Sequence, residues 1–155
     1  MKTDLTVEIE QALIKRARRK SERYGLEVRV PNGICDFVTS KLCFMNHSIP
    51  HITCYEIKVS LNDYLYSENG ANFVGDENYY VMPQELWDTI KDTEKVFKIQ
   101  NKGLIIYKGG KLYKKTDGTN RIKRLTLEDK LLIMDTLLMQ ALYYGTKEIE
   151  DEKQN

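Results

Sequence analysis

The sequence predicts an α/β fold in which a central mixed sheet is flanked by helices. Short runs rich in β-branched and aromatic residues, typical of strands, recur between residues 26 and 113 and are separated by glycine, proline and polar turns. Segments with helical periodicity precede, interrupt and follow these runs. Because 155 residues is the usual size of one domain, we expect a single domain over 1–145 and a charged flexible tail over 146–155.

The first helix is expected over residues 4–24, which contain no glycine or proline and carry apolar side chains every four positions: Leu5, Ile9, Leu13 and Ala17. Gly25 is predicted to end it as a C′ glycine. At about 100° per residue, Glu10 lies about 60° from the centre of the apolar stripe and Glu8 about 140°. We therefore expect Glu10 to point inward and Glu8 to lie in water.

A hairpin is predicted next, with strands at 26–30 and 33–38 joined by a tight turn at Pro31-Asn32-Gly33. Asp36 is the only charged residue of the second strand. A side-chain period of two places Asp36 on one face of that strand, together with Ile34 and Val38.

The stretch 52–60, Ile-Thr-Cys-Tyr-Glu-Ile-Lys-Val-Ser, is predicted to form a buried central strand. Glu56 and Lys58 share one of its faces, while Tyr55 and Ile57 share the other. Burying this acid and base is unfavourable unless another group pairs with them or coordinates them, so the strand is interpreted as the floor of a site. The alternative is an edge strand with an exposed ion pair that contributes less than about 1 kcal/mol.

The remaining elements are a helix over 61–69 capped by Ser60 or Asn62, a strand at 79–82, a helix at 84–91, and a hairpin at 104–107 and 111–113. Thr126 and Asp129 resemble a capping box that opens a last helix running to about Tyr144. A second Glu-x-Lys, at 128–130, lies in the first turn of this helix and is expected to be solvated. Because the helix is apolar almost all round, it is expected either to be covered on most sides or to lie in a subunit interface, and the second alternative predicts a homodimer through residues 126–144.

Charge is segregated along the chain although the formal net charge is only +1. Residues 60–94 hold eight acids and one lysine, residues 95–124 hold ten basic residues and one acid, and residues 15–23 form a second basic run. Two basic segments suit a phosphate backbone, and the expected contacts are Lys15, Arg16, Arg19, Lys108, Lys111, Lys114 and Lys115. The alternative is a solvated helix face and a lysine-rich hairpin.

Composition also limits the class of protein. No apolar run approaches the ~18 residues of a membrane span, and the charged N-terminal segment does not resemble a signal peptide, so we expect a cytoplasmic protein that does not bind membranes. Three cysteines without CxxC spacing argue against a disulfide framework. A zinc site from Cys43, His47, His51 and Cys54 has suitable ligand types, but its spacing fits no common zinc module, and buried thiols with loop histidines are the preferred interpretation.

The order of elements and acids resembles the PD-(D/E)XK nuclease superfamily, the restriction endonuclease-like fold. Glu10 matches the acid of the family's first helix, Asp36 its lone aspartate, and Glu56-Ile57-Lys58 its E-x-K, although Cys35 rather than proline precedes Asp36. Two further segments, 60–64 and 78–83, are similar to the MmcB-like DNA-repair group and related phage-encoded proteins. The resemblance spans about residues 8–108 and implies a restriction endonuclease-like core.

This resemblance implies a metal-dependent nuclease acting on DNA, including single-stranded or branched DNA. Converging carboxylates repel by about 4 kcal/mol per pair at ~4 Å and an effective dielectric of about 20, and a divalent cation would remove that penalty. Ligation by Asp36, Glu56 and the Ile57 carbonyl, with Glu10 acting through water, suits Mg²⁺ or Mn²⁺. Lys58 would orient the attacking water or offset charge in the transition state, and a protein that binds nucleic acid or a protein partner without cutting remains the alternative.

Overall fold

The computed structural model describes residues 1–42, 49–66, 72–120 and 125–154, with the backbone alone for 145–154. In chain order its elements are α1 (Asp4–Arg19), β1 (Arg23–Val30), β2 (Gly33–Leu42), β3 (Pro50–Ile57), α2 (Leu61–Tyr66), β4 (Glu77–Pro83), α3 (Gln84–Ile90), the 3₁₀ helix η3 (Glu94–Ile99), β5 (Gly103–Lys108), β6 (Lys111–Thr116) and α4 (Leu127–Gln154). The predicted helix at 61–69 is confirmed up to Tyr66, and its last residues lie outside the described ranges. The sequence pattern did not predict η3.

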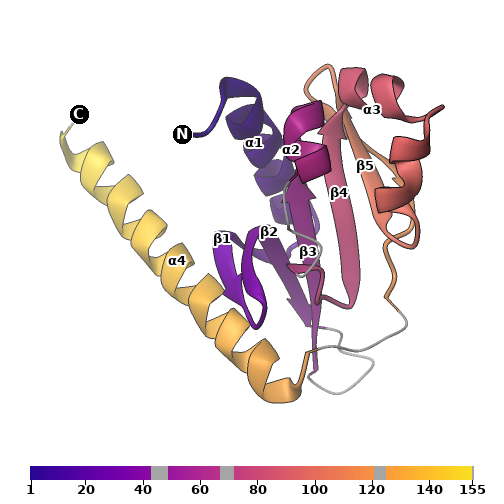
Figure 1. Cartoon of the computed structure of the whole chain (residues 1–155). Coiled ribbons are helices and arrows are strands. Elements are labelled where there is room, and N and C mark those ends of the chain that lie inside the picture. Colours follow the sequence, from indigo (N-terminus) through magenta and orange to yellow (C-terminus); the bar gives the residue numbers. More distant parts are fainter. Residues whose placement is uncertain (43–48, 67–71, 121–124, 155) are drawn as a thin grey trace.

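Six strands form one sheet in the order β1-β2-β3-β4-β5-β6 (Figure 1). The β1–β2, β2–β3 and β5–β6 pairs are antiparallel, and β3–β4 and β4–β5 are parallel. The sheet is therefore mixed and flanked by helices, which confirms the predicted α/β class. Because β3, β4 and β5 run the same way, their carboxyl ends meet at one edge, where α2 and α3 begin (Figure 1).

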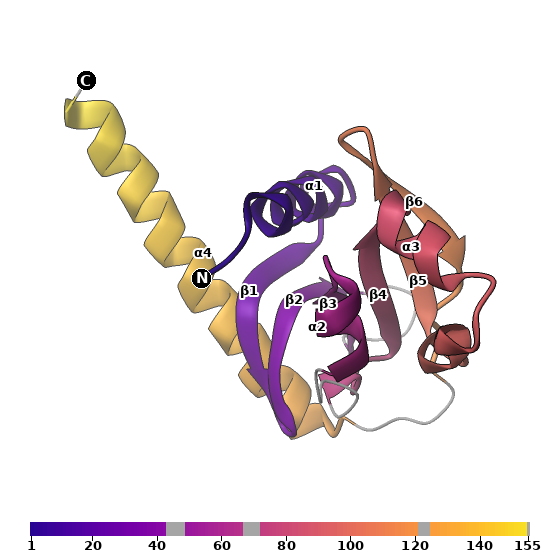
Figure 2. The same cartoon turned by 45° about the horizontal axis from the view of Figure 1, so that its top comes forward.

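Helix α1 covers one face of the sheet (Figure 2). Its buried side chains pack against side chains from the four central strands, with Ile9, Leu13 and Ala17 facing Phe37, Tyr55, Ile57, Tyr79, Val81 and Ile105. As predicted, Glu10 is buried and Glu8 is exposed. The periodicity of the apolar residues therefore placed this helix correctly, and its acid lies close to the sheet.

Helix α4 and the shorter helices share the other face. Ile133 and Leu137 of α4 pack on the β1–β3 half, where they contact a cluster that includes Val38, Ile52 and Cys54. The side chains of α2, α3 and η3 cover the β4–β5 half. Tyr55 and Ile57 face α1 while Ile52 and Cys54 face α4, so β3 alternates as predicted.

The end of the first helix was predicted wrongly. Helix α1 stops at Arg19, Ser21 adopts a left-handed conformation with φ of 54°, and Gly25 lies inside β1. Gly25 is needed there for a different reason, since a Cβ atom at this position would lie 2.6 Å from Leu137 Cδ2 and 2.9 Å from Gln140 Oε1. The glycine lets α4 approach β1 closely.

The capping box of α4 is confirmed. The Thr126 N–H donates to Asp129 Oδ2 at 3.0 Å, and the Asp129 N–H donates to Thr126 Oγ1 at 3.1 Å. Two features of this helix differ from the predictions. Lys130 is not solvated but is 7% exposed, and α4 continues to Gln154 because the charged residues of the predicted tail, many of them glutamate and lysine, are good helix formers. None of the described helices combines the length and the hydropathy of a membrane span.

Candidate functional site

The charged pair of the central strand is buried. Strand β3 is third in the sheet, with β2 and β4 on either side, and Glu56 and Lys58 are 0% and 2% exposed. Lys58 Nζ lies 3.9 Å from Glu56 Oε2, and the Lys58 N–H donates to the Val81 carbonyl just beyond the end of the strand. The alternative of an exposed pair on an edge strand is therefore wrong.

Lys58 has a second acidic neighbour that the sequence pattern did not reveal. Its ammonium lies 3.5 Å from Asp63 Oδ1, in the first turn of α2. Ser60 caps that turn, since its Oγ accepts from the Asp63 N–H at 3.2 Å. This cap fixes the start of α2 close to the end of β3. The Lys58 ammonium therefore lies near Glu56 on one side and near the half-exposed Asp63 on the other.

Asp36 lies where β2 separates from β3. The last register pair of these strands is Phe37 with Tyr55, and beyond it Asp36 Oδ2 accepts the Ile57 N–H at 2.8 Å. A side-chain carboxylate thus takes the place of a main-chain carbonyl in the ladder. Asp36 is thereby held in direct contact with the peptide that joins Glu56 to Ile57.

The predicted face for Asp36 is wrong in detail. Cys35 packs in the same cluster as Val38, on the α4 side, whereas Phe37 packs on the α1 side. Strict alternation would put Cys35 and Phe37 together, so the alternation slips at Asp36. The slip directs the carboxylate toward the β3 main chain instead of into a layer of side chains.

Glu10 is bound to a cation of the chain itself. Lys2 Nζ lies 2.6 Å from Glu10 Oε1 and 3.2 Å from Glu27 Oε1. Burial works to lower the pKa of Lys2, but its hydrogen bonds to Glu10 and Glu27 outweigh this effect and the pKa is raised. Glu27 has a φ of 49° and lies in β1 between the residues paired with Cys35 and Phe37, so Lys2 lies on the β1–β2 side of α1.

The Glu56 carboxylate acts on its buried neighbours. Burial and, to a smaller extent, the nearby Glu56 carboxylate raise the pKa of Tyr80 to about 12. Burial also raises the pKa of Cys35, with Cys54 and then Glu56 acting in the same direction. Both neighbours stay neutral at physiological pH, and the Lys58 ammonium, 3.9 Å from Glu56 Oε2, offsets the Glu56 charge.

The donor set fits a hard cation only in part. Asp36 of β2 and Glu56 and the Ile57 carbonyl of β3 are oxygen donors, which suit Mg²⁺ or Mn²⁺. Mg²⁺ is often held by one or two carboxylates, with waters and substrate phosphate completing its shell. Among the residues that the structure describes, however, no three His, Cys, Asp or Glu side chains are grouped closely enough to hold a metal ion. Glu10 in particular is engaged by Lys2.

The alternative zinc site cannot be assembled from described residues, because Cys43 and His47 lie outside them. The other two members are separately engaged. His51 Nε2 lies 2.8 Å from Glu77 Oε2, and Cys54 is fully buried in the cluster under α4.

Two basic segments that are distant in sequence meet across α1 and β6. A cavity of about 390 Å³ is lined by Arg16 and Arg19 of α1, by Lys20 directly after it, and by Leu112 and Lys114 of β6. Burial lowers the pKa of Lys20, and Arg16 and Lys114 lower it further. This crowding of positive charge favours an anionic ligand. Lys15 is exposed on the same helix.

A second basic cavity, of about 680 Å³, lies along the β5–β6 hairpin. Its walls include Lys108, Lys111, Lys114 and Lys115, together with the half-exposed Tyr113. Lys114 is 3.4 Å from Asp117 Oδ1, but such an exposed pair contributes little, so the lysine can bind other anions. Lys114 lines both cavities, which makes the two basic surfaces continuous. Lys108 ends β5, at the same edge of the sheet as Ile57.

Comparison with known proteins supports the fold alone. No known protein family and no curated protein matches the sequence. Among solved structures, the chain is similar to the SPO1766 protein of unknown function from Silicibacter pomeroyi, with a TM-score of 0.72 and 12% sequence identity. The similarity covers 98% of this chain and 96% of that one.

Proposed function

We propose that this chain is a cytoplasmic, metal-dependent nuclease or DNA-processing protein of the restriction endonuclease-like group, hydrolysing phosphodiester bonds in DNA. The observation that supports it is the joining of Asp36, Glu56 and Lys58 at the carboxyl end of the central strand. Asp36 binds the main chain of Ile57, and Lys58 lies 3.9 Å from Glu56. An Asp of one strand therefore contacts the main chain of the Glu-x-Lys segment of the next strand.

Each residue has a role in this proposal. Asp36 and Glu56, with the Ile57 carbonyl, would hold Mg²⁺ or Mn²⁺, and Glu10 would contribute through water. When bound, such an ion polarises a phosphodiester and lowers the pKa of a water molecule. Lys58 is fixed between Glu56 and Asp63, so its ammonium can orient the attacking water or stabilise negative charge on the transition state.

The basic cavities would hold the DNA backbone. Arg16, Arg19 and Lys114 converge on one cavity, and Lys108, Lys111 and Lys115 line the other. Lysine and arginine contacts to phosphate release counterions, so binding should weaken steeply as salt is raised.

The test is cleavage of single-stranded, duplex and branched DNA with Mg²⁺ or Mn²⁺, and with EDTA as the blank. Asp36→Asn is the sharpest variant, because the amide oxygen can still accept the Ile57 N–H while the charge is lost. We expect the cleavage rate to fall at least 100-fold with an unchanged circular dichroism spectrum. Lys58→Ala should also be inactive, and Lys91→Ala, which removes an exposed lysine, is the matched control.

Mn²⁺ binding measured by calorimetry gives a readout that does not depend on activity. Wild type should bind the ion, and Asp36→Asn should bind it at least tenfold more weakly. Undiminished cleavage by Asp36→Asn or Lys58→Ala, or no cleavage by wild type of any of these substrates, would refute the nuclease proposal.

A second function is favoured by the engagement of Glu10. Its Oε1 is bound by Lys2, and no three metal-binding side chains gather in the described part of the chain. A protein with this fold could bind nucleic acid without cutting it. Fluorescence anisotropy with a labelled oligonucleotide in EDTA distinguishes the two: salt-sensitive binding that Arg16→Glu or Lys114→Glu abolishes, together with an absence of cleavage, would support the non-cutting function.

A further inference from the structure

Helix α4 has a second apolar face that nothing in the described structure covers. Its inner face packs on the sheet through Lys130, Ile133, Leu137 and Gln140. Among the described residues, eight large apolar side chains of α4 are 41–64% exposed: Leu127, Leu131, Leu132, Leu138, Met139, Leu142, Tyr143 and Tyr144. The C-terminal part of the helix also extends away from the rest of the chain (Figures 1 and 2).

One side of α4 carries the apolar area of a small interface. Leu127, Leu131, Leu138 and Leu142 lie within about 60° of one another around the helix, at about 100° per residue. Each leaves on the order of 100 Å² accessible, given that a fully buried aromatic side chain covers about 150–250 Å². This face therefore presents roughly 400 Å² of apolar side chain on each copy, about half of the ~800 Å² that each partner contributes to a standard-size interface. Exposed apolar patches of this size on soluble proteins mark interaction sites.

The spacing of the apolar residues matches a helix pair. Leu131, Met134, Leu138 and Ala141 are separated by three, four and three positions, which is the a/d repeat of a two-stranded coiled coil. All four are exposed or half-buried. This stripe differs from the inner stripe that includes Ile133 and Leu137, so α4 can pack on the sheet and on another helix at once.

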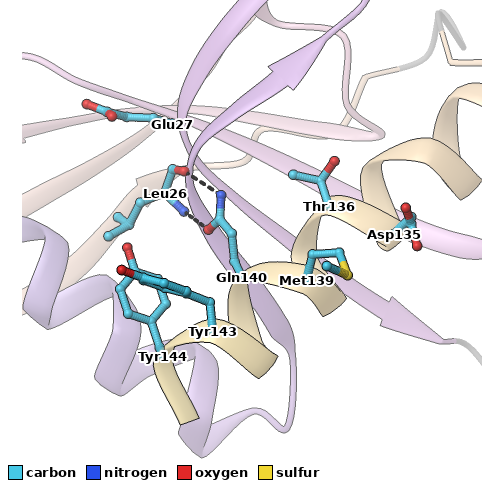
Figure 3. A pocket seen from close by; sticks show the side chains of 8 residues that line it. All are labelled: Leu26, Glu27, Asp135, Thr136, Met139, Gln140, Tyr143 and Tyr144. Carbon is cyan, nitrogen blue, oxygen red and sulfur yellow. Dashed lines mark hydrogen bonds between the residues drawn. The ribbon is translucent and has the colours of Figure 1, made fainter. Parts of the chain in front are cut away.

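The Gln140 side chain hydrogen-bonds α4 to β1, with a groove on each side. Gln140 accepts the Leu26 N–H at 3.0 Å and donates to the Leu26 carbonyl at 2.9 Å (Figure 3). One groove, of about 540 Å³, has the acids Glu27 and Asp135 at its wall. The other, of about 420 Å³, has Arg18 and Arg23 with one acid, Glu22.

The opposite charges on the two sides of α4 favour one relative orientation of the helices in a symmetric dimer. When two helices pack face to face and run the same way, the two-fold axis lies along them and brings the left flank of one against the right flank of the other. When they run in opposite directions, like flanks meet. Only the first arrangement brings the flank of Asp135 in one copy against the flank of Arg18 and Arg23 in the other.

We propose that the outer face of α4 binds the same face of a second copy of this chain, with the two helices parallel. Light scattering at tens of micromolar should give twice the 18.1 kDa mass of the chain. Leu131→Glu with Leu138→Glu should yield a folded monomer with an unchanged circular dichroism spectrum, because both side chains are exposed in the single chain. Phe97→Glu is the matched control, since Phe97 is 59% exposed on η3, and it should remain a dimer.

Cysteine cross-linking tests the orientation. Leu131→Cys and Ala141→Cys, each in a Cys43→Ser background, should both form disulfide-linked dimers under mild oxidation. In an antiparallel pair, a residue meets the same residue of the other copy only where the two-fold axis crosses the helices. Positions 131 and 141 are about 15 Å apart along the helix, so an antiparallel pair could cross-link at one of them at most. Cross-linking at only one position would overturn the parallel arrangement. A monomeric wild type, including one that instead sediments with phosphatidylcholine vesicles, or a dimer that survives the double glutamate variant, would overturn the interface.

Discussion

Replacing Lys130 by methionine is expected to lower the free energy of unfolding by about 3 kcal/mol. The Lys130 ammonium lies 2.8 Å from Asp76 Oδ2 and donates to the Pro50 carbonyl at 3.0 Å. The side chains of Lys130 and Asp76 are 9% and 16% exposed. Removing one partner of a buried pair costs about 3–5 kcal/mol, and the lower end applies because Asp76 keeps the Ile52 N–H as a donor.

The measurement is urea unfolding of both proteins at pH 7, followed by circular dichroism. A loss of this size should also lower the midpoint of thermal unfolding by about 6–12 °C in a chain of this length. Lys91→Met is the control, because Lys91 and Asp88 form an exposed pair of the same chemistry, and it should change stability by less than about 0.5 kcal/mol.

A double variant separates the buried charge from lost packing. In Lys130→Met with Asp76→Asn, the amide oxygen still accepts the Ile52 N–H, and no uncompensated charge remains, so we expect recovery of more than half of the lost stability. A loss below about 1 kcal/mol for Lys130→Met, or a double variant less stable than the single one, would refute the reasoning.

Three further predictions concern stability. The hydrogen bond to Glu77 raises the pKa of His51 above 6.5, so the stability that it contributes is present below pH 6.5 and is lost as the pH rises. The same bond lowers the pKa of Glu77 below 4.5, so the stability contributed by the Glu77 carboxylate is lost as the pH falls. His51→Gln should therefore lose more stability at pH 5.5 than at pH 8, by less than about 1 kcal/mol for so exposed a pair, and equal losses would contradict this. Gly25→Ala should destabilise by about 1–3 kcal/mol in urea unfolding, since its Cβ would overlap Leu137, and an unchanged midpoint would argue against that contact. Gln140→Leu should cost about 1–3 kcal/mol by leaving the Leu26 main chain without these two bonds, with faster amide exchange at Leu26 as the direct readout.

The parts of the fold that follow from periodicity could be predicted from the sequence. The four-residue spacing in α1 placed Glu10 inward, and the alternation in β3 placed Tyr55 and Ile57 on one face. Burial of Glu56 and Lys58 followed from their apolar flanks. The Thr126 and Asp129 pair marked the start of α4 because capping depends on neighbouring residues alone.

The parts that depend on contacts between distant segments could not be predicted. Asp36 faces the Ile57 main chain because β2 and β3 separate there, and no local pattern encodes where two strands part. Gly25 has the local signature of a helix end but is required by α4, more than a hundred positions later. In the sequence, Lys130 resembles a solvated lysine in the first turn of a helix. Its burial is favourable because Asp76, from a distant segment, pairs with it.

Within the candidate site, the acids were identified but their cationic partners were not. Lys2 lies eight positions before Glu10, outside the spacing at which residues of one helix meet, and it reaches the acid from the extended N-terminal segment. Asp63 pairs with Lys58 only because α2 turns back toward the end of β3. Such pairs depend on how elements are joined, which composition and periodicity do not specify.

The two borders of the sheet bear on how this chain avoids aggregation. A strand at the border of a sheet carries main-chain groups that can recruit a strand from another molecule. At β1, helix α4 lies along the border, and its Gln140 side chain hydrogen-bonds to the Leu26 main chain as a neighbouring strand would. At β6 the protection is electrostatic, since Lys111, Lys114 and Lys115 are exposed along the strand. Detachment of α4 would therefore expose the main-chain groups of β1, and fibril formation by a variant with a weakened α4 should begin there.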